Sequence, residues 1–172
     1  MDVLDEFFRH NTMMNGRLLE ACRGLSPEQL AATATGTYGT IGATLVHVAN
    51  GQVGYAARFL RAERPAPLPE DPFPGFDALT ERFDLGNANL EESAARVRAG
   101  EDHEIQVRDD DPPRTWRMPA SLILLQAVNH GTEHRSQVAT ILTGIGIEPP
   151  EMDGWTYFLD AGLMVPVPEA SS

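Results

Sequence analysis

Four segments of the chain repeat apolar residues at intervals of three and four, and this periodicity restricts the fold more than any other feature. An α-helix turns once every ~3.6 residues, so the spacing gives each segment one apolar face that must be buried. The segments run from Asp2 to about Gly24, from Thr40 to about Ala62, from about Phe76 to Gly100, and from Pro119 to Gly144. Amphipathic helices bury these faces against one another. The sequence therefore predicts an all-α four-helix bundle.

Shorter stretches separate these helices. In Ser26-Pro27-Glu28-Gln29 a serine N-cap, a proline and a glutamine that closes a capping box predict a short connecting helix. The loop PAPLPEDPFPG, which starts at Pro65, contains five prolines and should cross the surface. Alternating apolar residues over 104–118 predict a small β-hairpin before the last long helix. We expect the tail to pack back across the bundle through Trp155, Tyr157, Phe158 and Leu159.

Length and charge narrow the functional classes. With 172 residues the chain has the size of one domain, so we treat residues 1–172 as a single domain. A net charge of −12 would repel nucleic acid and anionic lipid, so neither is an expected partner. No stretch reaches the roughly 18 uninterrupted apolar residues of a membrane span. The single cysteine, Cys22, and an acidic amino terminus without a signal-peptide pattern favour the cytoplasm.

The inner face of the last helix carries two histidines. Its apolar stripe continues through both, in steps of three and four, as Ile123, Ala127, His130, His134, Val138 and Ile141. Two imidazoles four residues apart lie one turn apart on one face, and both can bind one ion at about 2.0–2.1 Å. Without a metal, their four ring nitrogens would need separate hydrogen-bond partners. The pair is therefore either part of a metal site or two core histidines with hydrogen-bond partners in the protein, and the spacing alone allows both interpretations.

A third histidine lies in the predicted second long helix. His47 shares a stripe of small residues with Gly51 and Gly54, which leave room either for an ion or for the close approach of another helix. In the second case His47 is only a packed histidine at a tight crossing. Three histidines with one open position form the ligand set of a catalytic zinc site rather than a structural one. His47, His130 and His134 are therefore the candidate metal ligands.

Polar residues near these histidines are candidates for supporting roles. Glu133 is adjacent to His134 and is the candidate acid or base, with a solvated surface glutamate as the alternative. Residues that could orient the rings or a bound water are Asn50, Gln126, Asn129, Thr132 and Gln137. The two remaining histidines, His10 and His103, should be solvated.

The segments GTIGATLVHVANGQ around His47 and LLQAVNHGTEHRSQVATILTGIG around the histidine pair resemble the DinB family of damage-inducible, YfiT-like metalloenzymes. The likeness extends to NGRLL, which starts at Asn15, and to PPEMDGWTYF in the tail, so it covers nearly the whole chain. It implies a bundle that binds one divalent ion through His47, His130 and His134. Nickel or zinc is the expected metal, with iron and manganese as alternatives.

The resemblance also implies an activity. Some members transfer a low-molecular-weight thiol to small electrophiles, and a metal suits this chemistry because it deprotonates a coordinated thiol. We therefore expect a small-molecule substrate, a thiol cosubstrate and, as in relatives, a homodimer. Arg135 could bind an acidic group of the thiol or could cover the surface with its stem.

Three other functions stay open. Residues 130–134 also match H-x-x-E-H, the inverted zinc-protease pattern, which needs a third ligand downstream from among Glu148, Glu151 and Glu169. A three-histidine site could instead activate water and hydrolyse a small ester or amide. The bundle could also bind a metal or a small molecule without catalysis.

Overall fold

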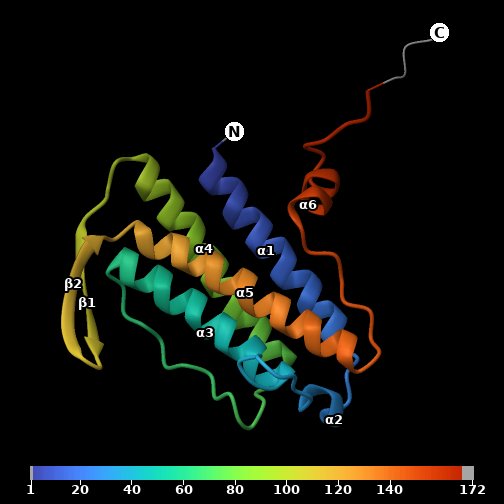
Figure 1. Cartoon of the computed structure of the whole chain (residues 1–172). Coiled ribbons are helices and arrows are strands. Elements are labelled where there is room, and N and C mark those ends of the chain that lie inside the picture. Colours follow the sequence, from blue (N-terminus) through green and yellow to red (C-terminus); the bar gives the residue numbers. More distant parts are fainter. Residues whose placement is uncertain (1, 168–172) are drawn as a thin grey trace.

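Helices form most of the computed structural model, which describes residues 2–167 (Figure 1). The four long helices are α1 (Val3–Cys22), α3 (Ile41–Leu60), α4 (Phe76–Arg98) and α5 (Leu122–Gly144). The two short ones are α2 (Pro27–Leu30) and α6 (Gly154–Asp160). Both α1 and α3 pack against α4 and α5, so the predicted all-α four-helix bundle is confirmed. None of the helices in the described part of the chain is long and apolar enough to cross a bilayer.

Side-chain caps begin several of these helices where the sequence predicts. Thr40 accepts a hydrogen bond from the backbone N–H of Ala43 at the start of α3, and Ser26 and Gln29 form the capping box of α2. The last long helix differs from the prediction. It begins at Leu122 rather than at Pro119, because Pro119 is the last residue of a strand and the next N–H, of Ala120, bonds to the carbonyl of His103.

The predicted hairpin is present between α4 and α5. Strand β1 (Glu104–Asp110) pairs antiparallel with β2 (Pro113–Pro119), and Val107 lies opposite Trp116. The hairpin lies at the end of the bundle where α4 ends and α5 begins (Figure 1).

The tail packs less closely than predicted. On α6 only Tyr157 is buried, and its hydroxyl bonds to Glu6 of α1. Trp155 is 66 % exposed, and Phe158 and Leu159 are exposed as well. The predicted packing of the tail on the bundle is limited to one side of α6, because a helix of 7 residues turns only one side towards α1.

Buried apolar side chains form two clusters, and between them lies a polar layer made of Asn11, Asn15, Gln52 and Arg135. One cluster holds Leu18 of α1, the first half of α3 and the end of α5, and the other holds Phe8 of α1 and the start of α5. Cys22 belongs to the first cluster, and burial raises the pKa of its thiol to about 12, so it acts as a small apolar residue. The candidate histidines lie at the level of the polar layer, where the apolar core is interrupted.

Candidate metal centre

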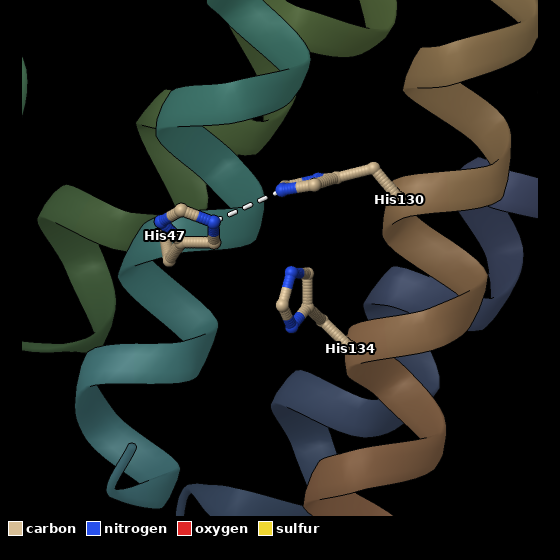
Figure 2. A group of neighbouring side chains, drawn as sticks. All are labelled: His47, His130 and His134. Carbon is tan, nitrogen blue, oxygen red and sulfur yellow. Dashed lines mark hydrogen bonds between the residues drawn. The ribbon is translucent and has the colours of Figure 1, made fainter. Parts of the chain in front are cut away.

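The three candidate ligands meet between α3 and α5 (Figure 2). One ring nitrogen from each of His47, His130 and His134 lies within 4.8 Å of the other two. Nε2 of His130 is 3.0 Å from Nε2 of His47. Two imidazoles that bind one ion at about 2.0–2.1 Å place their nitrogens roughly 3 Å apart, so the spacing fits a shared ion. His130 and His134 are each 8 % exposed, and His47 is half-buried.

A glycine on α3 creates the space for His130. A Cβ built at Gly51 would lie 2.7 Å from Cε1 of His130, closer than side chains tolerate. The imidazole therefore lies directly over the α3 backbone. The small residues around His47 thus permit a close approach of α5, and that approach is what brings His130 into the centre.

Two residues that the sequence did not indicate hold His47 in place. Its Nδ1 lies 3.2 Å from Oε1 of Glu70, and its ring stacks on Tyr38 with the centroids 3.9 Å apart. The Tyr38 hydroxyl donates to both oxygens of Glu70, at 3.1 and 3.0 Å. Burial and the Glu70 carboxylate raise the pKa of Tyr38, so this hydroxyl keeps its proton. The carboxylate fixes a proton on Nδ1 of His47 and leaves Nε2 free to bind an ion.

Gln137 does the same for His134. Its Oε1 lies 3.0 Å from Nδ1 of His134 and also accepts the backbone N–H of Tyr38 at 2.9 Å. An amide oxygen only accepts, so Nδ1 of His134 donates and Nε2 faces the centre. Among the residues proposed to orient the rings, Gln137 has this role.

The protonation of His130 also fits a metal. Burial, with help from His134 and His47, lowers the pKa of His130 to about 4. The ring is therefore neutral at pH 7 and has a free lone pair. Three imidazoles that converge on one point are a donor set for zinc, nickel or a similar divalent ion.

Most of the other polar candidates lie elsewhere. Glu133, Gln126, Asn129 and Thr132 are exposed on α5, and none of them hydrogen-bonds to the three histidines. Asn50 instead bonds both ways with the backbone of Leu68, at 2.9 and 3.0 Å, and so fastens the proline-rich loop to α3. His10 and His103 are half-buried rather than solvated, and neither joins the centre.

Arg135 is inside the bundle, so both interpretations of it are wrong. It is 3 % exposed, and its guanidinium donates to the side-chain oxygens of Asn11 and Asn15, each at 2.8 Å. Gln52 accepts from the amides of the same two asparagines, at 2.8 and 3.0 Å, and donates to Asn87 of α4. Burial lowers the pKa of Arg135 to about 10, which leaves it charged at neutral pH. This polar layer connects all four long helices beside His134.

A cavity of about 540 Å³ opens beside the centre. His47 and His130 line one part of it, and the face of α3 that follows His47 forms a wall with part of the proline-rich loop. Its volume suits a small molecule.

Comparison with known proteins agrees with this architecture. Residues 1–161 match the model of the DinB family. The crystal structure of a DinB-like protein from Bacillus cereus ATCC 10987 has the same fold, with 15 % sequence identity and a TM-score of 0.63 over 87 % of this chain and 95 % of that one. A search of curated proteins found no match. The resemblance seen in the sequence is confirmed, and the chain belongs to the DinB family.

Proposed function

We propose that this protein is a metal-dependent enzyme that transfers a low-molecular-weight thiol to small electrophiles. The proposal depends chiefly on the convergence of His47, His130 and His134, two of which are directed towards the centre by Glu70 and Gln137. Three imidazole ligands leave at least one coordination position for a substrate, as in catalytic rather than structural zinc sites. Zinc or nickel suits the ligands, with iron and manganese as alternatives.

A divalent ion bound there would lower the pKa of a coordinated thiol and supply a thiolate at neutral pH. Glu70 and Gln137 keep protons on the outer ring nitrogens of their histidines, so the inner nitrogens stay available. Tyr38 stacks on the ring of His47 and covers one of its faces. The cavity beside His47 and His130 is large enough to admit a small-molecule reactant to the centre. In the transfer, sulfur bonds to the electrophilic carbon as the bond from that carbon to its leaving group breaks with its electron pair, and the thiol proton passes to solvent.

Metal analysis and an activity screen test this proposal together. We expect about one divalent ion per chain in the purified protein, lost in His47→Ala, His130→Ala and His134→Ala. His103→Ala is the matched control, because it removes a histidine outside the centre and should keep the ion. Thiols are then screened against small electrophiles, with and without a chelator. Turnover that needs both the ion and the thiol supports the transferase, whereas an ion without turnover supports a binding protein.

Hydrolysis of a small ester or amide is the second candidate. It is favoured by the same three-histidine set, which in other sites activates a bound water. Hydrolysis without a thiol, lost on chelation, would identify it in the same screen. The protease-like pattern has less support, because His47 supplies the third ligand while Glu148 and Glu151 are exposed. Glu169 lies outside the described residues.

We also propose that the chain forms a homodimer. An apolar surface on α1 and α5 supports this, since Val3, Phe7 and Leu125 line one groove and are 69, 54 and 69 % exposed. Contiguous exposed apolar surface marks an interaction site. Light scattering should give the mass of a dimer, and Leu125→Asp should shift it to that of a monomer. A monomeric wild-type protein would contradict this proposal.

A further inference from the structure

The cavity beside the metal centre contains two arginines without an acidic partner. Among the described residues, Arg58 and Arg64 line this cavity and form neither an ion pair nor a hydrogen bond. Six other arginines do pair with carboxylates, namely Arg9, Arg17, Arg23, Arg96, Arg98 and Arg117. Acidic residues outnumber arginines in this chain by 25 to 13, so carboxylates are plentiful. Two unpaired guanidiniums at one cavity therefore suggest an anion from outside the chain.

Gly54 allows Arg64 to lie against α3. A Cβ at this position would lie 3.0 Å from Cζ and 3.1 Å from Nε of Arg64. Glycine weakens the interior of a helix relative to alanine, and here the missing side chain gives the guanidinium its place on the cavity wall. Arg64 is thus seated on the helix that also carries His47.

The loop that carries Arg64 is fastened on two sides. Asn50 of α3 holds Leu68 through two hydrogen bonds, and Arg82 of α4 donates to the carbonyl of Ala66 at 2.7 Å. Prolines at 65 and 67 restrict the backbone between these points. A fixed loop lowers the entropy that binding would otherwise cost.

The cavity is polarised along α3. His47, Gly51, Gly54 and Arg58 are spaced four, three and four residues apart, so they follow one helix face. At ~1.5 Å per residue, Gly54 is about 10 Å and Arg58 about 16 Å from His47 along the axis. Glu70 lines the end near His47, where it would repel a carboxylate, and the arginines lie beyond. An anionic ligand therefore has one favoured orientation.

We propose that the cavity binds a small molecule with a terminal carboxylate, held by Arg64 and Arg58, whose other end reaches the three histidines. A guanidinium complements a carboxylate in charge and in geometry. The net charge of −12 favours a monoanion over a polyanion. The contact between the ligand and the three histidines rests on the proposed function. The carboxylate subsite does not, because it depends on the two arginines alone.

Calorimetric titration of the metal-loaded protein with three probes tests this inference. The probes are 6-mercaptohexanoate, 6-mercaptohexanol and hexanoate, which share a chain but differ in the thiol or the carboxylate. We expect 6-mercaptohexanoate to bind about tenfold more tightly than 6-mercaptohexanol, as a charge-assisted contact predicts. The preference should disappear in Arg64→Gln, decrease in Arg58→Gln and weaken with added salt. Arg61→Gln is the matched control, since Arg61 is a neighbouring exposed arginine outside the cavity lining and its loss should preserve the preference.

Equal affinity for the two thiols, no measurable binding of 6-mercaptohexanoate, or an undiminished preference in Arg64→Gln would overturn the carboxylate subsite. The comparison of 6-mercaptohexanoate with hexanoate tests the proposed function separately, because these two probes differ only in the thiol. If 6-mercaptohexanoate binds no more tightly than hexanoate, and both lose affinity in Arg64→Gln, the subsite stands and metal-dependent thiol binding fails. Both arginines are exposed, so the variants should keep the wild-type melting temperature.

Discussion

Replacing Gly51 with alanine should remove the metal from a protein that remains folded. The added methyl group would lie 2.7 Å from Cε1 of His130, about 0.7 Å short of the 3.4 Å at which ordinary contact begins. The imidazole must therefore move by roughly that amount, because the α3 backbone behind the methyl group cannot retreat. Metal–nitrogen distances tolerate only about 0.2 Å. We expect the metal affinity to fall by about 10- to 100-fold.

Competition with a chromophoric chelator measures this affinity, and thermal melting reports on the fold. Gly16→Ala is the matched control, because a methyl group there meets no atom within 4 Å on the exposed side of α1. The control should gain up to ~1 kcal/mol of stability from helix propensity and keep its metal affinity. Wild-type metal affinity in Gly51→Ala would refute the argument that His130 is a ligand seated over this glycine.

Three further predictions follow from the structure. Glu70→Gln should lower the metal affinity about tenfold by weakening the hydrogen bond to Nδ1 of His47, as measured by chelator competition, and an unchanged affinity would remove Glu70 from the centre. The metal-free protein should lose stability in urea as the pH falls from about 6.5 towards 4. The reason is that His130 in the unfolded chain binds a proton in this pH range, whereas His130 in the folded chain does not, because its pKa is lowered to about 4. An unfolding free energy that stays constant over this pH range would be inconsistent with a buried neutral ring. Arg135→Ala should cost about 3 kcal/mol of unfolding free energy, because it leaves the side-chain oxygens of Asn11 and Asn15 without a donor, whereas a loss below about 1 kcal/mol would indicate that water replaces the guanidinium.

Local patterns in the sequence account for the helices and the three histidines. The inner stripe of the last helix, which includes His130 and His134, is buried throughout as its spacing predicts. His47 could be joined to this pair because all three lie on helix faces, where residues recur with a known period. Glu133 lies next to His134 in the sequence but on the exposed side of the same helix.

Contacts between loops and helices could not be predicted in this way. Tyr38 lies in a turn rich in glycine and threonine and Glu70 in a proline-rich loop, so no periodicity indicates that they meet at His47. The burial of Arg135 could not be predicted from its own position, because a charged side chain in a helix is usually exposed. A signal for its burial was present, since Asn11 and Asn15 follow Phe8 at intervals of three and four on the inner face of α1. Two amides on an apolar face require an internal polar partner.

X-ray absorption at the metal edge of the purified protein tests the metal centre most directly. The coordination of a divalent ion by His47, His130 and His134 predicts three imidazole nitrogens at about 2.0–2.1 Å, together with at least one exchangeable light ligand. His47→Ala should lose one of these imidazoles or the ion itself. A spectrum without imidazole scattering, or one that His47→Ala leaves unchanged, would contradict the proposed centre.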